Sequence, residues 1–287
     1  MNAISASRSG YRSRICRIAE RSSSLIVDYP SKVLKSRKSL RAQFPGTFMA
    51  QQKDGVPSAA EEYSKRWEIL WNGGNEDFEV KNGDGGILKP GQSFDAGKSA
   101  PHLTDFLQQK GLGDVEQKTV LIPGCGRGYD VVSFVKYGAS DVTGLEIAPT
   151  AVASATVLLD TELKGDLRKR ARVVPGDFFS PSGDTKYDIG YDYTFFCAIH
   201  PSMREGWAQS WSKHLKSGGT LVTSIFPDFE DRSITGPPWP VWPDLYKEVL
   251  DTAGFTLRSL EKVDEGKSHS GRGGKEWLAV WDKISKF

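Results

Sequence analysis

The sequence predicts an α/β protein with a doubly wound, mostly parallel sheet of seven strands that ends in an antiparallel hairpin. Three observations lead to this fold class. After residue 119, short β-branched or apolar runs alternate with helical stretches, which is typical of a parallel sheet covered by helices. A glycine-rich turn follows the first of these runs. At the carboxyl end, two apolar runs flank a polar, glycine-rich connection, as in a hairpin added to a parallel sheet.

The parallel strands are expected where β-branched and apolar residues cluster between turn signals. They are Thr119 to Ile122, Asp141 to Glu146, Arg172 to Val174, Tyr187 to Phe196, and Thr220 to Phe226. The terminal hairpin is expected to pair Phe255 to Val263 with Trp277 to Ile284.

Helices are expected between these strands, and glycines mark where several of them stop. One runs from about Tyr129 to Tyr137 and stops at Gly138. Another runs from about Pro201 to Leu215, ahead of a Ser-Gly-Gly segment at 217–219. After a proline-rich insert at 236–243, a further helix passes through Leu250 and stops at Gly254.

The first 48 residues differ in composition from the rest of the chain. They hold ten Lys or Arg against two acids, a net charge of +8 (10 − 2), so the remainder carries −6 (2 − 8). They also hold ten serines, and a basic, serine-rich, acid-poor segment is typical of an organellar transit peptide. A disordered tail is the alternative, and Met49 would serve equally well as a translation start. We therefore assign residues 1–55 to an extension and 56–287 to one structured domain.

Composition also limits the partners and the compartment. The acidic body argues against nucleic acid, because binding to phosphate backbones needs clustered Lys and Arg. No apolar run approaches the ~18 residues of a membrane span, and the three cysteines have no C-x-x-C spacing, so neither a membrane nor a metal site is expected. We expect a monomer that acts on a small molecule in the cytosol, or in mitochondria if the extension directs import.

An aromatic segment precedes the sheet. In residues 59–71, Tyr63, Trp67, Leu70 and Trp71 fall at helical spacing and give one aromatic face. Residues 72–101 then carry seven glycines and include Phe94, which suits a long loop that closes over a ligand. Periodicity alone favours an ordinary amphipathic core helix.

The glycine-rich turn is Gly124-x-Gly126-x-Gly128, directly after a strand and before a helix. Such a turn lets a ligand approach the backbone and offers it the N–H groups of a helix amino terminus. The dinucleotide fingerprint would need glycine at 129 or 131, where the chain has Tyr129 and Val131, and no Gly-Lys-Ser or Gly-Lys-Thr follows. A nicotinamide dehydrogenase and a P-loop enzyme are therefore disfavoured.

Two further polar positions follow neighbouring strands. Glu146 ends the next strand, 22 residues after Gly124 (146 − 124), where a carboxylate can accept hydrogen bonds from ribose hydroxyls. Asp177 and Phe178 follow the third strand and suit an adenine. The plain alternatives are that Glu146 is a solvated glutamate at a strand end and that Asp177 and Phe178 belong to a simple turn. Because ligands of open α/β sheets bind at this edge, the set points to an adenosine ligand without a phosphate requirement, namely S-adenosylmethionine.

Several motifs in order carry a family resemblance. They are Trp67-x3-Trp71, Phe94-Asp95-x-Gly97, Ile122-Pro-Gly-Cys-Gly126, Gly176-Asp177-Phe178, Asp192-Tyr193-Thr-Phe-Phe-Cys-Ala-Ile199, and Gly236-Pro-Pro238 followed by Tyr246 and Gly254-Phe255. The series resembles the thiopurine, halide and thiol methyltransferase family, most closely its plant and fungal halide and thiol branch. The resemblance covers roughly residues 60 to 285.

The resemblance implies a class I methyltransferase (Rossmann-like) fold and methyl transfer from S-adenosylmethionine to a small soft nucleophile: a thiol, hydrosulfide, thiocyanate or halide. It implies that the glycine loop (Gly124, Gly126) and Glu146 contact the amino acid and ribose parts of the cofactor. Asp177 and Phe178 would contact adenine, and Trp67, Trp71 and Phe94 would form a lid over the cofactor. Tyr193 would face the methyl group and the substrate, as a cofactor-contacting and catalytic residue.

One position departs from the family pattern and leaves alternatives open. The plant branch tends to carry an acid where this chain has His200, followed by Pro201. His200 is a candidate catalytic base or anion-steering group, or else a helix cap. An O- or N-methyltransferase acting on a secondary metabolite, and a non-catalytic S-adenosylmethionine-binding scaffold, are the alternative functions.

Overall fold

The computed structural model describes residues 59–75, 80, 86–113, 115–180 and 183–285, so the basic extension at 1–55 lies outside the described residues. Seven strands form one sheet. They are β1 (Thr119–Pro123), β2 (Asp141–Glu146), β3 (Ala171–Pro175), β4 (Tyr187–Tyr193), β5 (Leu215–Ile225), β6 (Phe255–Lys262) and β7 (Trp277–Lys283).

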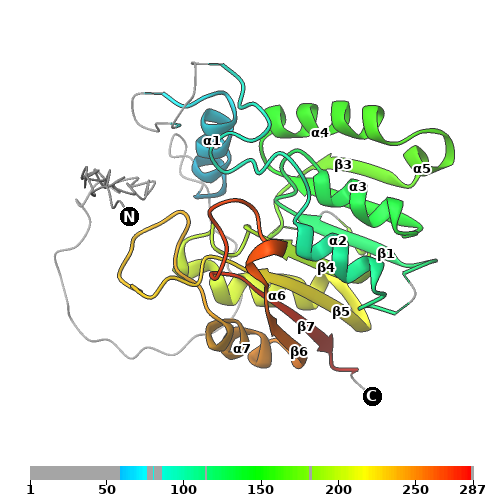
Figure 1. The fold of residues 1–287 in the computed structure, drawn as a ribbon, viewed down its shortest axis with the longest axis vertical. Helices are drawn as coiled ribbons and strands as arrows, with labels where there is room; N and C mark the ends of the chain where they lie inside the picture. Colours follow the sequence, from blue (N-terminus) through cyan, green and yellow to red (C-terminus); the bar gives the residue numbers. More distant parts are fainter. Residues whose placement is uncertain (1–58, 76–79, 81–85, 114, 181–182, 286–287) are drawn as a thin grey trace, which may run out of the picture.

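The α-helices surround this sheet (Figure 1). They are α1 (Ala59–Trp71), α2 (Pro101–Gln108), α3 (Tyr129–Lys136), α4 (Pro149–Glu162), α5 (Gly165–Lys169), α6 (Arg204–His214) and α7 (Pro243–Thr252), with short 3-10 helices η1 (Pro201–Met203) and η2 (Glu265–Lys267). None of the helices in the described part of the chain is long and apolar enough to cross a membrane.

The strand order is β3-β2-β1-β4-β5-β7-β6. The pairs from β3 to β5 are all parallel, and β7 lies antiparallel between β5 and β6. The predicted seven-stranded doubly wound sheet with a terminal hairpin is therefore confirmed. Because β1 to β5 are parallel, their carboxyl ends meet at one edge, and the chain reverses its winding direction between β1 and β4.

Two apolar layers hold the helices on the sheet. One contains buried residues of α2, α3 and α4, such as Leu103, Phe134 and Leu159. The other contains buried residues of α6 and α7, including Trp207, which is fully buried. Burial of this area from water on both faces is the main stabilising contribution to the sheet.

Two predicted boundaries were wrong. The strand expected to reach Phe196 ends at Tyr193, because Thr194 takes a left-handed conformation with φ 62° and the Asp192 carboxylate accepts a hydrogen bond from the Phe196 N–H at 3.2 Å. The strand expected to start at Thr220 starts at Leu215 instead. The glycine-containing segment 217–219 forms an irregularity within the β4–β5 pairing and does not end the strand.

The helices agree more closely with the sequence pattern. The helix predicted at 59–71 is confirmed over the described residues, and it ends at Trp71. The helix predicted from Pro201 is split into η1 and α6. Helix α2 begins at Pro101, the last residue of the predicted loop at 72–101. Proline at the first helical position explains that start, because its φ is already helical and its missing N–H costs nothing there.

Candidate active site

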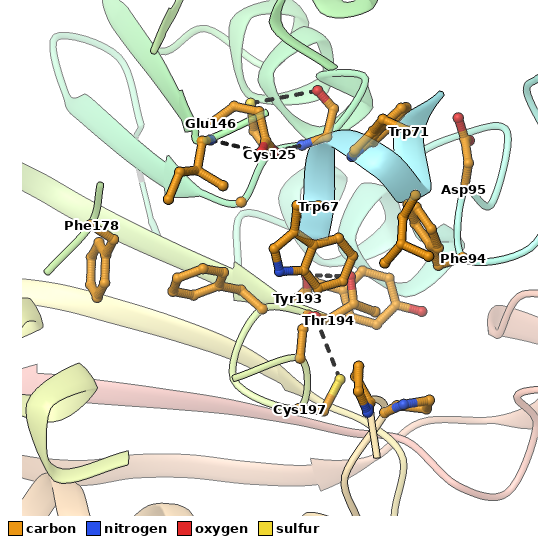
Figure 2. Close-up of a pocket in the computed structure, with 18 of the residues that line it drawn as sticks. Trp67, Trp71, Phe94, Asp95, Cys125, Glu146, Phe178, Tyr193, Thr194 and Cys197 are labelled. Atoms are coloured by element: carbon orange, nitrogen blue, oxygen red, sulfur yellow. Dashed lines mark hydrogen bonds between the residues drawn. The ribbon is translucent and has the colours of Figure 1, made fainter. Parts of the chain in front are cut away.

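A cleft of about 1100 Å³ lies over the carboxyl ends of β1 to β4. Figure 2 shows aromatic side chains, among them Trp67, Phe94 and Phe178, spread around it, with Cys125 of the glycine loop and Glu146 at one side. All ten predicted site residues line it: Trp67, Trp71, Phe94, Gly124, Gly126, Glu146, Asp177, Phe178, Tyr193 and His200. The volume is enough for a drug-sized ligand together with a small second molecule.

The glycine loop connects β1 to α3 and takes a conformation that other residues rarely adopt. Gly124, Gly126 and Gly128 have φ values of 55°, 53° and 84°. A Cβ on Gly126 would lie 3.2 Å from the Trp71 ring, and one on Gly124 would lie 2.5 Å from the Phe195 ring. The loop therefore needs glycine both for its backbone and for the close approach of the aromatic walls.

Glu146 ends β2 and is 5% exposed. Its Oε1 accepts hydrogen bonds from the N–H groups of Ile147 (2.7 Å) and Ala148 (3.0 Å), and its Oε2 accepts one from Gly126 (2.9 Å). Burial raises the pKa of the carboxyl group, while these three N–H donors oppose the rise. The carboxylate thus fixes the glycine loop against the end of β2.

Helix α1 crosses the mouth of the cleft. On one side Ser64 donates to the Ile147 carbonyl (3.3 Å), and on the other the Tyr63 hydroxyl donates to the carbonyl of Ala198. Its two tryptophans meet Phe94 edge to face, each with 5.5 Å between ring centroids. The aromatic face that periodicity predicted is directed into the cleft as well as into a small apolar cluster.

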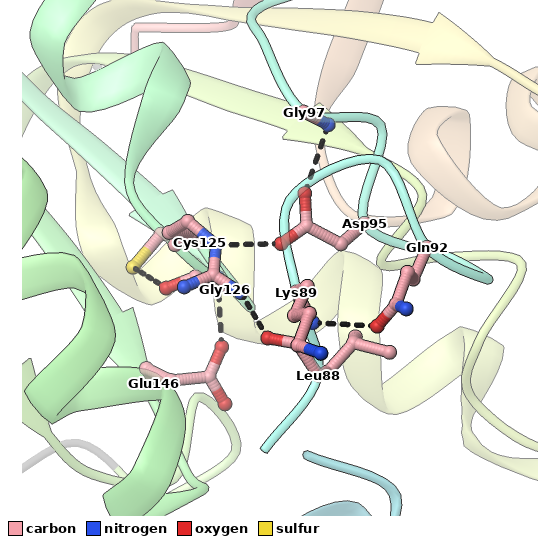
Figure 3. A network of polar contacts seen from close by, with 9 residues as sticks. Leu88, Lys89, Gln92, Asp95, Gly97, Cys125, Gly126 and Glu146 are labelled. Carbon is pink, nitrogen blue, oxygen red and sulfur yellow. Dashed lines mark hydrogen bonds and ion pairs between the residues drawn. The ribbon is translucent and has the colours of Figure 1, made fainter. Parts of the chain in front are cut away.

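An ion pair joins the glycine loop to the segment that carries Phe94 (Figure 3). Arg127 Nε donates to Asp95 Oδ2 at 2.7 Å, and the two side chains are 11% and 1% exposed. Arg127 also donates to the Leu88 carbonyl, and Asp95 accepts from the Gly97 N–H at 2.8 Å. The guanidinium lies 5.5 Å from the Trp71 ring. We call this set of contacts the Arg127 latch.

Tyr193, at the end of β4, belongs to a second buried polar cluster. Its hydroxyl donates to Glu276 Oε1 at 2.6 Å and accepts from Arg272 Nη1 at 2.7 Å. Arg272 lies in the β6–β7 connection and lines the cleft, whereas Glu276 is fully buried. Burial raises the pKa of Tyr193 well above its ordinary value, and Arg272 acts in the opposite direction.

The two residues predicted to face adenine, Asp177 and Phe178, also have partners within the protein. Asp177 Oδ1 accepts from the Phe179 N–H at 2.9 Å, which is the turn contact that the plain alternative anticipated. Phe178 is 3% exposed, and its ring stacks on His214 with 4.9 Å between centroids. Phe195, 5.4 Å from Phe178, also lines the cleft.

His200 lies at the exposed rim of the cleft. Its Nδ1 accepts a hydrogen bond from the Ser202 N–H at 3.3 Å, so His200 caps η1.

Two cysteines lie in or beside the cleft. Burial raises the pKa of the Cys197 thiol to about 12 and that of Cys125 well above its ordinary value. Both thiols therefore stay protonated at neutral pH, as expected of small packing residues.

The residues of the site that were not predicted from the sequence include Arg127, Phe195, Arg272 and Glu276. Two of them carried a weak signal. Arg127 stands between two glycines of the predicted loop, and Arg272 stands between two glycines of the predicted hairpin connection. A charged residue in such a segment is a reasonable candidate for a site. Glu276 gave no signal of this kind.

Comparisons with known proteins agree with this architecture. A glycopeptide N-methyltransferase solved with S-adenosylmethionine is 17% identical, covers 65% of this chain and 95% of its own, and superposes with a TM-score of 0.52. A geranyl diphosphate C-methyltransferase from Streptomyces coelicolor A3(2) is 14% identical, covers 64% and 79%, and has a TM-score of 0.52. The chain therefore has the fold of the class I methyltransferases.

Sequence relatives narrow the class to a family. The model of the thiopurine S-methyltransferase family matches residues 90–283, and the chain belongs to that family. A probable thiol methyltransferase 2 from Arabidopsis thaliana is 36% identical over 72% of this chain and 88% of the relative. A thiocyanate methyltransferase 1 from Brassica oleracea is 33% identical over 67% and 80%.

Proposed function

We propose that this enzyme transfers the methyl group of S-adenosylmethionine to a small soft nucleophile: a thiol, hydrosulfide, thiocyanate or halide. The observation that carries the proposal is an aromatic-walled cleft whose floor is the glycine loop and Glu146. Family membership and relatives that are named for thiols and thiocyanate support the same class of acceptor.

The chain's residues suit the parts of the cofactor. A carboxylate has about four lone-pair sites, and three of those on Glu146 are taken by backbone N–H groups. The fourth, on Oε2, is open to a ribose hydroxyl. Gly124 leaves room for the amino acid part, and Asp177 with Phe178 offers an edge and a ring for adenine.

When it is bound, the cofactor supplies an electrophilic methyl group on a sulfonium. The faces of Trp67, Trp71 and Phe94 attract this positive charge, with a contribution of ~0.5 to 2 kcal/mol for each favourable contact. They also exclude water, which leaves the nucleophile less solvated and more reactive. Because soft anions need no deprotonation, alignment in a dry cleft supplies most of the rate acceleration.

The proposal also covers the domain bounds, the oligomeric state, the partners and the location of the enzyme. We assign residues 56–287 to the methyltransferase domain, with α1 and the segment around Phe94 as its lid. We expect it to act as a monomer, without nucleic acid or membrane partners. The cytosol is the expected location, or mitochondria if the extension at 1–55 directs import.

A panel of acceptors tests the proposal. The full-length protein, with S-adenosylmethionine, is assayed on iodide, hydrosulfide, thiocyanate and an aryl thiol, with an aliphatic alcohol and an amine as the contrasting acceptors. We expect turnover on one or more of the soft nucleophiles and none on the alcohol or amine. The control variant Glu162→Gln, an exposed change at the end of α4 that is not part of the cleft lining, should have the same activity as the wild type.

Two results would contradict the proposal. Cofactor binding without turnover on any acceptor would indicate a non-catalytic scaffold. Turnover confined to the alcohol or amine would indicate an O- or N-methyltransferase.

A further inference from the structure

We propose that Tyr193 and Glu276, held by Arg272, form a proton relay through which the enzyme uses neutral thiols as well as preformed anions. This inference rests on the proposed function, since it concerns the same cleft and the same acceptors. It assigns Tyr193 as the group that takes the thiol proton and Glu276 as the group that receives it through Tyr193.

The direction of the hydrogen bonds sets the direction of the relay. The Tyr193 O–H points at Glu276 Oε1, 2.6 Å away, because a carboxylate can only accept. Arg272 Nη1, 2.7 Å away, uses one lone pair of the phenol oxygen. One lone pair remains, and both Tyr193 and Arg272 line the cleft, so this oxygen can accept a proton from a thiol beside it.

The burial of Glu276 is otherwise unexplained. Glu276 is 0% exposed, and its Oε2 has no hydrogen-bond partner within the described part of the chain. An unsatisfied buried carboxylate oxygen destabilises the folded state. Accepting a proton neutralises the carboxylate, so the cost of its burial falls at the moment when the relay operates.

Arg272 supplies the positive charge beside the relay, because the two histidines that face Tyr193 are uncharged at neutral pH. His102 from α2 and His269 from the β6–β7 connection face it, and burial lowers the pKa of both, that of His269 to about 4. Both are therefore uncharged at neutral pH. Arg272 also lies 5.2 Å from the Tyr193 ring, where it stabilises negative charge that develops on the phenol oxygen.

Other titratable groups near the relay do not take over its role. Asp130 from α3 accepts from Ser99, and burial raises its pKa to about 6. Tyr191 from β4 bonds to Ser224 at 3.0 Å, and burial raises its pKa well above its ordinary value. Lys98 borders the cleft and is exposed. Tyr193 is thus the group that connects the cleft to a buried carboxylate.

The step balances in protons and electrons. Tyr193 Oη takes the thiol proton while its own proton passes to Glu276 Oε1. The freed electron pair on the thiol sulfur forms the new bond to carbon, and the pair of the broken methyl–sulfonium bond stays on the departing thioether. After the product leaves, the proton returns from Glu276 through Tyr193 to water in the cleft. Thiocyanate or a halide needs no such transfer.

The substitution Glu276→Gln tests the relay, because it keeps the acceptor oxygen for Tyr193 but cannot take a proton. At pH 6.5, kcat/KM for an alkanethiol should fall by about 10²-fold, the usual contribution of a general base. That for thiocyanate should change by less than about threefold. The variant's thiol rate should also rise about tenfold per pH unit up to the thiol pKa, whereas the wild-type profile is flatter.

Tyr193→Phe is the second variant: because Tyr193 also lines the cleft, both reactions should slow, but kcat/KM for the thiol should fall by a larger factor than kcat/KM for thiocyanate. Glu276→Asp should restore part of the thiol rate, and Glu261→Gln, an exposed change on β6, should alter neither reaction. Melting temperature and affinity for S-adenosylhomocysteine report on folding in each case.

The outcomes separate the two proposals. An equal loss with both nucleophiles, or no loss with either, would overturn the relay, as would a wild-type enzyme that methylates thiocyanate but no neutral thiol. A wild-type chain that methylates none of the soft nucleophiles of the acceptor panel contradicts the proposed function and removes the relay with it, whereas one that methylates iodide but no neutral thiol overturns the relay alone.

Discussion

At the scale of single residues, Asp192 is the buried carboxylate that shapes the end of β4. It is fully buried, its Oδ2 accepts from the Trp207 indole at 2.8 Å, and its Oδ1 accepts from the Phe196 N–H. These contacts turn the chain after Tyr193 and so place that tyrosine at the cleft. Burial raises the pKa of Asp192 to about 7 despite both donors.

This raised pKa predicts a pH dependence of stability. Between the ordinary value of 3.8 and about 7, the folded chain holds a proton on Asp192 that the unfolded chain releases, so the free energy of unfolding falls as pH rises and levels off above 7. Asp192→Asn removes this titration. From pH 4 to pH 7, the free energy of unfolding of the wild type should therefore fall relative to that of Asp192→Asn by up to roughly 4 kcal/mol.

Urea unfolding of both proteins at pH 4 to 9 measures this difference. Groups such as Asp130 and His269 titrate in both proteins and largely cancel. Parallel curves for the two proteins across the whole range would show that Asp192 is ionised throughout.

The sequence predicted some of these residues for physical reasons. Glu146 and Asp177 could be predicted as site residues because strand ends can be located from apolar patterns and because parallel strands share an edge. Glu276 was not, since its role depends on a contact with Tyr193, 83 positions away, and nothing local distinguishes it from a surface glutamate. The same holds for the pairing of Arg127 with Asp95.

At the scale of elements, the lid is attached to the body by polar contacts as well as aromatic ones. Glu68 of α1 accepts from the Thr150 N–H at the start of α4 (3.0 Å), and the Leu88 N–H donates to the Trp71 carbonyl (2.9 Å). The Arg127 latch adds the link to the glycine loop. A change in the latch should therefore alter the lid and the cofactor loop together.

Asp95→Asn tests the latch. It leaves Arg127 almost buried with a neutral partner, and loss of one charge from such a pair is costly. We expect the KM for S-adenosylmethionine to rise about tenfold with a smaller change in kcat, and amide hydrogen exchange across 86–97 to become faster. Asp141→Asn, which breaks an exposed ion pair with Arg172, is the matched control and should change neither. An unchanged KM with unchanged exchange would show that the latch does not hold the lid.

The elements also show where sequence patterns stop being informative. Helix α1 was predicted because its aromatic spacing is strongly periodic. The end of β4 was not, because the apolar run continues to Ile199 while the Asp192 side chain turns the backbone. A side-chain hydrogen bond overrode strand propensity there.

At the scale of the whole molecule, the sheet order and the cleft belong together. The chain changes its winding direction between β1 and β4, and the cleft opens above this point, as in other open α/β sheets. The fold could be predicted because alternating patterns and the rules for parallel connections leave few topologies. The terminal hairpin then adds Arg272 and Glu276 to the same edge, which no topological rule specifies.

The central claim is that this edge binds S-adenosylmethionine with Glu146 as a direct contact. Calorimetric titration of that molecule into the full-length protein and into Glu146→Ala tests it most directly, with Glu162→Gln as control. We predict one saturable site in the wild type and the control, and an affinity at least about tenfold weaker in Glu146→Ala, equivalent to one lost hydrogen bond to a charged group. Absence of binding by the wild-type chain, or equal affinity in a folded Glu146→Ala protein, would contradict the claim.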